Sequence, residues 1–577
     1  MQEERNWGFE EKMFHYWEHL IYLKENPKLR NIAEKLTGIR RAEGLLSIFR
    51  RVFFMKLDRY DVKRREEIMS NEEIRLAEQL IKYYVSSWQD KSRRGLFDLW
   101  EKVESYWEGN PRLPESENDP NSNINFVHPN VEGQVALLME QNIAVSASPS
   151  SPSDAPFAGT VQTVLEWIKD KNKLMRKLDV HERRREKFGT GIFRVLYDPD
   201  AVGGFGMPVI EACNPAYVFV DPNITDVYKI NDGAFVIETL NKPISWARKR
   251  FGSERADIIR AGFHPSEDFI FGESVGENYI HILAWIRTNG HLRLVQMSGC
   301  GVILDDRFHY GERFPYFFTP LYSREGVVWA KGDAELLLPL QDLVDDLDDQ
   351  IRINARLSGN PQRIVDISSN IDLDKWTNES GLIIPTNNIN GVKYLVPPEM
   401  PAYPMQRREL ALQFERQMLT RFADNMTGQK TSGVRTATEA AGLQRQGDLV
   451  IGHKKVLLQE TLAEVFEYCL ELIKEYYTEE KSFRVGEDFL WFRGSDLKKV
   501  PQLIPGNKRS GTKYMRNGTV TKDAKFDIVV TVGAGLPGDK MFMRDFMLKA
   551  LEKGAISTDE MRKWIERNIG FEKLTAE

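Results

Sequence analysis

The most regular hydrophobic pattern in the chain lies between Asp333 and Leu357 and has the period of an α-helix. Its apolar positions follow the i, i+3, i+4, i+7 spacing of one buried stripe: Leu340, Leu343, Val344, Leu347 and Ile351. The opposite face is acidic, with seven carboxylates from Asp333 to Asp349 and no Lys or Arg. Like charges this close destabilise an isolated helix, so we expect groups outside it to compensate for them. Pro339 lacks an amide donor, which predicts a kinked or separate first turn.

Two further helices are predicted after this one, beyond a group of short strand-like segments. These segments, PQRIVDI, GLIIPT and GVKYLVP, fall within residues 361–397 and are separated by Asn, Ser and Gly. The second helix, about 404–424, has an apolar stripe formed by Leu410, Phe414, Met418 and Phe422. A polar loop at 425–436 leads into a third helix at about 437–477. Its glycines predict a bend in its first half: Gly442, Gly447 and Gly452.

The rest of the chain mixes helices with short strands. Residues 1–110 are predicted to be helical, most clearly at 71–107, and a linker or long loop follows at 108–125. A Ser/Pro loop at 146–156 precedes a basic helix at about 159–187. Strands are expected at 191–199, 207–215, 216–222, 233–240, 278–287, 291–297, 482–493 and 525–532, a helical piece at 244–259, and two terminal helices at 539–553 and 558–569. This order predicts an α+β protein, not a regular βαβ series.

Composition narrows the possible classes of protein. A chain of 577 residues is long enough for three or four domains, and a net charge of -6 argues against a surface that grips nucleic acid throughout. Its three cysteines are far apart and form no CxxC or Cys/His spacing, so neither a disulfide framework nor a zinc site is expected. No apolar run approaches the ~20 residues that span a bilayer. We therefore expect a protein of a reducing cytosol, without secretion or a membrane anchor.

The basic segment from Lys28 to Arg65 has two interpretations. It contains twelve Lys or Arg against four acids, so it could touch nucleic acid or a partner. It also contains core-type residues such as Phe49, Val52 and Phe53, which favour a solvated helical face balanced by acids elsewhere. The segment alone does not decide between the two.

Motifs for catalysis are weak. GAGLPG, with Gly533, Gly535 and Gly538, fits the GxGxxG pattern between a strand and a helix, so a dinucleotide-binding oxidoreductase is one hypothesis. It is disfavoured because two capped helices fill the remaining residues, where a second strand with an acidic residue should follow. DPDAVG at 198–203 lacks the ligands of a calcium loop, and GxxxxGK[ST], GxSxG and HExxH are absent. We expect no enzyme activity, metal or cofactor.

The acidic helix face from Asp342 to Asp349 leaves three interpretations open. A metal site would need ligands converging from another segment, and the sequence offers no candidate. An exposed helix surface is the simplest alternative. Third, the face could form the wall of a DNA channel. Basic proteins bind DNA because their cations release the counterions around the phosphates, and an acidic wall cannot do this, so a duplex could slide past.

Several segments together resemble the portal proteins of tailed double-stranded DNA bacteriophages. The resemblance covers roughly Asn125 to the C-terminus and depends on the order and spacing of individually degenerate segments. These are NFVHPNVEGQVALLMEQNIAVSASPSS, EKFGTGIFRVLYDPD, IEACNPAYVFVDPN, GDAELLLPLQDLVDDLDDQIR, GVRTATEAAGLQRQGD and GLPGDKMFMRDFMLKALEKGAIS. The first ~120 residues have no recognisable counterpart.

The resemblance implies a portal-type subunit with a wing, a helical stem, a small β-rich clip and a C-terminal helical crown. Residues 1–124 would be a helical extension or outer wing and 125–332 the α+β wing. Residues 333–357 and 403–424 would form the stem helices, 358–402 the clip and 425–436 the tunnel loop. The long helix and wing strands would occupy 437–538, and the crown helices 539–577.

The resemblance also implies a function and partners. Portal subunits form a ring, probably of twelve copies, at one capsid vertex. Terminase packages double-stranded DNA through the ring, which later releases it, and connector and tail proteins attach there. Major capsid and scaffolding proteins would be further partners, with assembly in the host cytoplasm and a final place in the virion. Another virion structural or scaffold protein that only shares helical rods is the alternative.

Site residues follow from the same resemblance. Asp345, Asp346 and Asp349 are candidates to face the channel or the outside of the stem, and Lys430 and Arg435 are candidates for transient phosphate contacts. The clip candidates for binding terminase or connector proteins are Arg363, Asp374, Lys375 and Trp376.

Overall fold

The computed structural model describes most of the chain between residues 68 and 532. The described ranges are 68–109, 124–139, 143–259, 278–309, 311–359, 362–372, 387–395, 401–418, 437–485, 488–498, 500–505 and 514–532. The predicted terminal helices, the loop at 425–436 and the GAGLPG motif lie outside these ranges.

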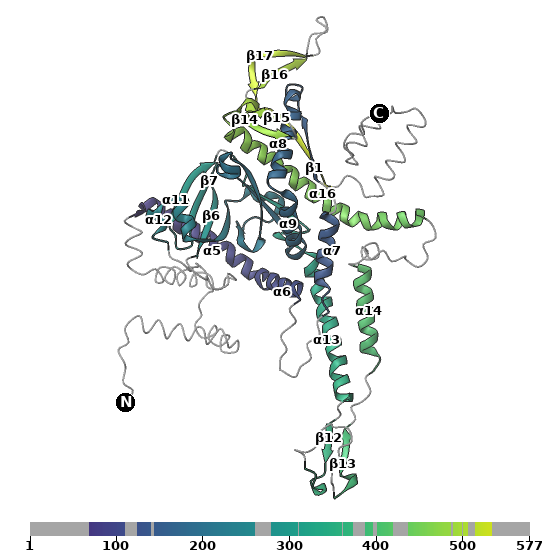
Figure 1. The fold of residues 1–577 in the computed structure, drawn as a ribbon. Coiled ribbons are helices and arrows are strands. Elements are labelled where there is room, and N and C mark those ends of the chain that lie inside the picture. Colours follow the sequence, from purple (N-terminus) through teal and green to yellow (C-terminus); the bar gives the residue numbers. More distant parts are fainter. Residues whose placement is uncertain are drawn as a thin grey trace, which may run out of the picture. The chain divides into compact units, whose positions relative to one another are not determined.

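Helices and strands alternate irregularly along the chain, which confirms the predicted α+β class (Figure 1). The α-helices are α5 (Asn71–Arg93), α6 (Leu96–Glu108), α7 (Val127–Met139), α8 (Ala155–Lys171), α9 (Leu174–Phe188), α10 (Ala201–Gly204), α11 (Ile244–Phe251), α12 (Ser253–Ala256), α13 (Asp333–Gly359), α14 (Tyr403–Met418) and α16 (Ala437–Tyr476).

The strands form one five-stranded sheet and several smaller sheets. They are β1 (Ile143–Pro149), β2 (Thr190–Asp198), β3 (Met207–Cys213), β4 (Val218–Val220), β5 (Phe235–Pro243), β6 (Asn278–Thr288), β7 (His291–Ser298), β8 (Ile303–His309), β9 (Tyr316–Pro320), β10 (Tyr322–Arg324), β11 (Val327–Lys331), β12 (Gln362–Val365), β13 (Val392–Leu395), β14 (Lys481–Val485), β15 (Asp488–Phe492), β16 (Val500–Pro505), β17 (Tyr514–Lys522) and β18 (Phe526–Val532). The largest sheet has the order β4-β5-β6-β7-β8, and a three-stranded sheet has the order β3-β2-β9.

The chain divides into two compact units. The first holds the described residues 68–85, 240–259, 278–283 and 295–306, and the second holds the other described residues.

In the first unit a buried polar chain crosses three strands. The His281 ring lies 3.2 Å from both Tyr279 Oη and Gln296 Oε1, and Gln296 Nε2 donates to Asp305 at 2.8 Å. Trp246 of α11 packs edge-on against His281, and the His281 and Gln296 side chains are buried.

The core of the second unit forms between the antiparallel pair of β1 and β18 and the helices α8 and α16. β1 and β18 pair antiparallel, from Ile143 opposite Val532 to Pro149 opposite Phe526. Their inward side chains join those of α8 and α16 in one apolar cluster: Val145, Ile528, Val530, Leu165, Ile168, Leu458, Leu462 and Phe466. Alternation of buried and exposed residues along both strands produces this one-sided packing.

Two predicted helices are each broken in two. The helix expected at 71–107 ends at Arg93 and restarts at Leu96, because Gly95 adopts a left-handed conformation with φ of 67°. The helix expected at 159–187 is interrupted at Asn172 and Lys173. The Asn172 amide donates to Pro208 O and accepts from Ile210 N of β3, and Lys173 has a φ of 50°. The hydrogen bonds of the Asn172 side chain to β3 thus form in place of a continued helix.

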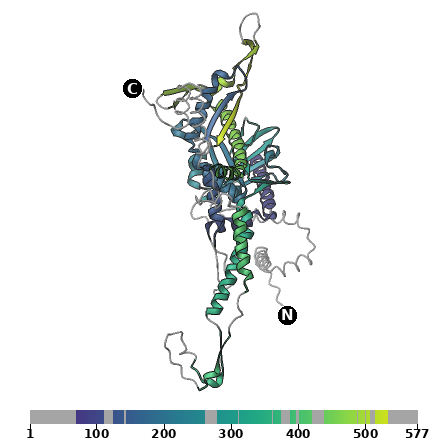
Figure 2. The same ribbon diagram turned by 90° about the vertical axis from the view of Figure 1, so that its right-hand side faces the viewer.

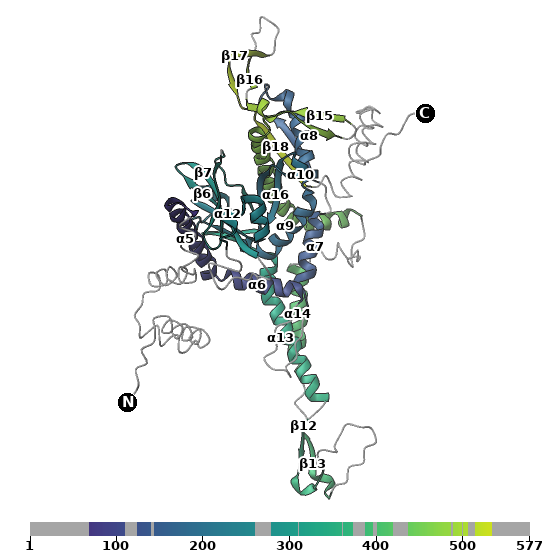
Figure 3. The same ribbon diagram turned by 60° about the vertical axis from the view of Figure 1, so that its left-hand side comes forward.

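Other expectations need smaller corrections. The loop predicted from residue 146 starts too early, since β1 continues to Pro149 in pairing with β18. The prediction of a separate first turn before Pro339 is wrong, because α13 runs without a break from Asp333 through Pro339. Seven strands were not predicted: β1, β8, β9, β10, β11, β16 and β17. The long third helix is confirmed as α16, and Figures 1 and 3 show it changing direction along its length, as its glycines predicted.

A helical arm projects from the second unit. It consists of α13, the β12–β13 pair and α14, and Figures 1 and 2 show α13 and α14 side by side, with the strand pair beyond their ends. The chain runs out along α13 and back along α14, so the two helices are antiparallel. The order helix, small β-structure, helix and long helix matches the predicted order of elements.

Candidate functional site: the helical arm and its root

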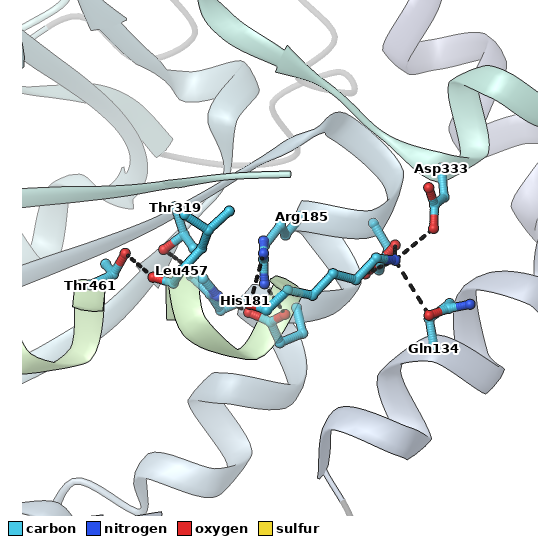
Figure 4. A network of polar contacts seen from close by, with 10 residues as sticks. Gln134, His181, Arg185, Thr319, Asp333, Leu457 and Thr461 are labelled. Atoms are coloured by element: carbon cyan, nitrogen blue, oxygen red, sulfur yellow. Dashed lines mark hydrogen bonds and ion pairs between the residues drawn. The ribbon is translucent and has the colours of Figure 1, made fainter. Parts of the chain in front are cut away.

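The arm begins where four helices meet around one buried lysine. Lys454 Nζ of α16 lies 2.9 Å from both carboxylate oxygens of Glu186 on α9 and 2.6 Å from Asp333 Oδ2, the first residue of α13. Gln134 of α7 accepts from the same nitrogen at 3.3 Å. Figure 4 shows Asp333 and Gln134 reaching this contact from separate helices. We call Gln134, Glu186, Asp333 and Lys454 the root network; all four side chains are buried.

The close approach of α9 to the start of α13 depends on two glycines. A Cβ at Gly332 would lie 2.6 Å from Glu186 O, and a Cβ at Gly189 would lie 2.2 Å from Ala330 O. Gly189 also has a φ of 79°, which ends α9 in a left-handed cap. Asp333 then occupies the first turn of α13, where the helix dipole favours a carboxylate.

The root network holds two carboxylates against one ammonium group. Burial raises the pKa of Glu186 to about 8, although the charge of Lys454 opposes this rise. Burial acts in the same direction on Asp333, but its ion pair with Lys454 and its hydrogen bonds outweigh burial and hold its pKa below the ordinary value. Glu186 is therefore the carboxyl group that retains a proton near neutral pH.

A second buried cluster continues from the root network into α9. Arg185 donates to Glu182 at 2.8 Å and to the carbonyl of Lys454 at 3.1 Å, so it links α9 to α16. Burial opposes ionisation of Glu182, but Arg185 outweighs it and lowers its pKa to about 2. Glu182 lies 2.8 Å from His181, whose pKa burial lowers. Figure 4 shows His181 next to Thr319, at 3.3 Å.

These clusters have no exposed face, which argues for a structural role. His181, Glu182, Arg185 and Glu186 are each 0% exposed, so a substrate could not reach them. A buried ion network of this kind fixes the geometry of the elements that it joins, because breaking one partner leaves an unpaired charge.

Further polar contacts hold the first half of α13. Lys102 of α6 pairs with Asp342 at 2.8 Å, and the Tyr106 hydroxyl donates to the same carboxylate. Gln341 accepts from Phe126 N at 2.9 Å and donates to Asp345 at 2.9 Å. The predicted compensation of the acidic face thus comes in part from neighbouring elements of the same chain.

The second half of α13 is held mainly by α14. Arg408 forms an ion pair with Asp348, in which Nη2 lies 3.3 Å from Oδ2 and Nε donates to Oδ1. Ala411, one turn along α14, is 6% exposed and faces the same contact. The predicted buried stripe of α13 is confirmed at Val344 and Leu347, whereas its other members are half-buried.

The outer surface of the arm carries large apolar side chains. On α13, Ile353 is 43% and Leu357 40% exposed. On α14, Tyr403 is 67%, Leu410 58% and Phe414 55% exposed. Leu410 and Phe414 belong to the predicted apolar stripe of this helix, and within one chain both are exposed. Side chains of this size in a row on two adjacent helices are typical of a surface that another protein covers.

The predicted site residues fall into three groups. Asp345 was a candidate to face the channel or the outside of the stem, but it is buried within one chain and accepts from Ile124 N at 3.3 Å; burial raises its pKa. Asp346 is exposed and Asp349 half-buried, both on α13. Arg363 lies in β12. The remaining candidates lie outside the described residues: Asp374, Lys375, Trp376, Lys430, Arg435, Gly533, Gly535 and Gly538.

Sequence reasoning missed the residues that organise the root. Lys454 lies within the glycine-containing part of a long helix, and Glu186 within a basic run. The one available signal was the pair Glu182 and Glu186, two acids at i, i+4 spacing inside that basic helix. Partners separated by 121 and 268 positions in the chain carry no local pattern.

Three further features concern the described part of the chain. Among those residues, no three His, Cys, Asp or Glu side chains come together as metal ligands would. Every described helix is too short or too polar to span a bilayer. All three cysteines, Cys213, Cys300 and Cys469, are free and buried.

No protein-family model matches this chain, and none of the curated proteins matches it either.

The root network predicts a large effect of removing its cation. Lys454→Met would leave the Asp333 carboxylate buried without an ammonium partner and the Glu186 carboxyl group without a hydrogen-bond donor, and we expect the free energy of unfolding to fall by about 3–5 kcal/mol. Chemical denaturation followed by circular dichroism measures it. As a matched control, Lys102→Met removes the partly exposed pair with Asp342 and should lower it by about 1 kcal/mol or less. Equal losses would contradict the role of Lys454.

The raised pKa of Glu186 predicts a pH dependence. Its ordinary pKa is 4.5 and its pKa in the folded chain is about 8, so the folded state binds the extra proton between these values. The stability contribution of Glu186 is then fully present below about pH 4.5 and lost as the pH rises through 8. Glu186→Gln removes this titration, so its stability relative to the original chain should rise from pH 5 to 8, by up to several kcal/mol.

This difference separates Glu186 from other titrating groups. Groups present in both proteins, including His181, cancel in the comparison, and Asp333 acts only below its ordinary value of 3.8 because its pKa is lowered. Denaturation curves for both proteins at several pH values provide the measurement. Parallel stability profiles from pH 5 to 8 would rule out a raised pKa of Glu186.

Proposed function

We propose that this protein is a portal subunit of a tailed double-stranded DNA bacteriophage. In this proposal about twelve copies form a ring at one capsid vertex, and DNA passes through the ring during packaging and ejection. The order of elements supports it: α13, the β12–β13 pair, α14, the loop at 425–436 and the long helix α16 follow each other as stem, clip, stem, tunnel loop and long helix would.

The observation that carries the proposal is the exposed apolar surface of the helical arm. Tyr403, Leu410 and Phe414 on α14 and Ile353 and Leu357 on α13 remain at least 40% exposed in one chain. A copy on each side would bury such side chains, and contacts between unlike faces close into a ring when the rotation closes. A rigid root supports the same interpretation, since it would keep the arms of all copies parallel.

The proposed mechanism is mechanical and electrostatic. The terminase large subunit would hydrolyse ATP and drive DNA through the ring, and this chain would provide the channel and no catalysis. Asp346 and Asp349 of α13, with Lys430 and Arg435 of the 425–436 loop, are the candidates to face the channel or the DNA. Connector and tail proteins, and terminase during packaging, would bind the segment from 358 to 402, with Arg363, Asp374, Lys375 and Trp376 as candidate contacts.

The proposal places the protein in the virion. Major capsid and scaffolding proteins would surround the ring during assembly in the host cytoplasm, and the mature ring would stay at the vertex. No cofactor is required for this role, because the energy for DNA movement would come from the partner motor.

Ring formation tests the proposal directly. Negative-stain microscopy and mass photometry of the purified full chain should show rings with an axial opening. Replacing Leu410 and Phe414 together by Glu should abolish the rings, because two charges would then lie in the contact. Met405→Glu is the matched control, since Met405 is 52% exposed on the same helix but lies about 140° around it from Leu410 and about 180° from Phe414. A persistent monomer of the unmodified chain would count decisively against a portal subunit.

A further inference from the structure

We infer that neighbouring copies meet through opposite faces of the helical arm, with the Arg407 face of α14 in one copy against the Asp346 and Asp349 face of α13 in the next. This inference rests on the proposed ring and adds to it the surfaces, their register and the charged pair that would join them.

Each helix of the arm carries one continuous outward row. On α14 the row is Tyr403, Arg407, Leu410 and Phe414, at spacings of i, i+4, i+7 and i+11, and all four are exposed. On α13 the row is Asp346, Asp349, Ile353 and Leu357, at spacings of i, i+3, i+7 and i+11. At 100° per residue, each row stays within about 80° of the helix circumference. Both rows combine apolar residues with charge, acidic on α13 and basic on α14.

The two rows point away from each other. The contact between α13 and α14 is marked by the Asp348–Arg408 pair and by buried Ala411. Asp346 is two residues from Asp348, and Leu410 is two residues from Arg408, so each lies about 160° around its helix from that contact. One arm therefore presents an acidic row on one side and a basic row on the other. Such a surface favours head-to-tail contacts between copies, the kind that closes into a ring.

The Asp348–Arg408 pair also fixes the register. Because the helices are antiparallel with equal rise, Arg407 lies at the level of Asp349, and Tyr403 at the level of Ile353. A closed ring relates its copies by rotation, so residues at one height stay at that height when the arms run along the ring axis. Rotation then brings the Arg407 guanidinium beside Asp349 and Asp346 of the next copy, and the Tyr403 ring against Ile353.

Contacts that the two aspartates make within their own chain do not oppose this pairing. A carboxylate has about four lone-pair sites and can accept a further hydrogen bond from a planar guanidinium. The pairing assigns Asp346 and Asp349 to the boundary between copies and takes them out of the set that would face the channel.

Mixing two defective variants tests this contact. Arg407→Glu and Asp349→Arg should each place like charges in every contact, so that neither variant alone forms rings. In a 1:1 mixture that alternates around an even-numbered ring, the two substituted positions face each other with opposite charges in every second contact. In the contacts between them, the unmodified Arg407 and Asp349 of the two variants face one another. We expect rings to return in the mixture, and also in the double variant that carries both changes.

The outcomes separate the inference from the proposed function. Rings of the unmodified chain that are not restored in the mixture would overturn the inference and leave the portal proposal standing. Recovery only in the double variant would show that the two residues pair within one chain, which also overturns it. Absence of rings from the unmodified chain would overturn both.

Two controls keep the experiment interpretable if a variant is destabilised. Glu409→Arg reverses a charge on the same helix, about 160° from Arg407, and should leave rings intact. In addition, Tyr403→Cys with Ile353→Cys should give a ladder of disulfide-linked copies under oxidation, because the three natural cysteines are buried. The absence of any linked species from assembled rings would contradict the proposed register.

Discussion

The position of the helical arm depends on the ammonium group of Lys454. It is the shared partner of Glu186 on α9 and Asp333 on α13, and it lies on α16. Charges that are buried together tolerate little displacement, because any separation leaves one of them without a partner in a medium of low polarity. Hydrophobic packing alone would let α13 slide against its neighbours, whereas this contact fixes the residue at which the helix begins. The arm can then act as a rigid extension of the second unit.

Along α13 the kind of contact changes from root to tip. Near the root, side chains from α6, α7, α9 and α16 surround the helix, and its polar groups bond within the chain. From Asp348 onward α13 pairs with α14 through Arg408, and the apolar side chains of Ile353 and Leu357 are exposed. The root is therefore held by contacts within one chain, whereas apolar side chains at the tip stay exposed to solvent. Such a gradient suits a protein that folds first and assembles afterwards, since the assembly surface is held in place before a partner arrives.

Local pattern predicted the elements of the arm but not how they are held. The stripe from Leu340 to Ile351 located α13, and the spacing around Leu410 located α14, because helical periodicity is written in neighbouring residues. The neighbouring residues do not show whether Leu410 faces a core or a partner, because its exposure depends on what packs against it. Breaks at Gly95 and Asn172 were missed for a related reason: the side chain of Asn172 ends its helix through bonds to β3, a strand about 40 residues later. The root network joins residues too distant in sequence to leave a spacing.

The acidic face of α13 is less negative in the folded chain than its sequence implies. As a bare sequence, seven carboxylates imply a strongly negative wall. In the folded chain Asp333, Glu335, Asp342 and Asp348 each lie beside a lysine or arginine, and Asp345 is buried. In the proposed ring, Arg407 of the next copy would balance Asp346 and Asp349 as well. Counterion release, which makes DNA adhere to proteins, requires cations free to replace the ions around phosphates, and cations already held by carboxylates cannot do so. A stem with most of its charges paired would then let a duplex slide without a strongly repulsive wall, because neither sign of charge is left in large excess.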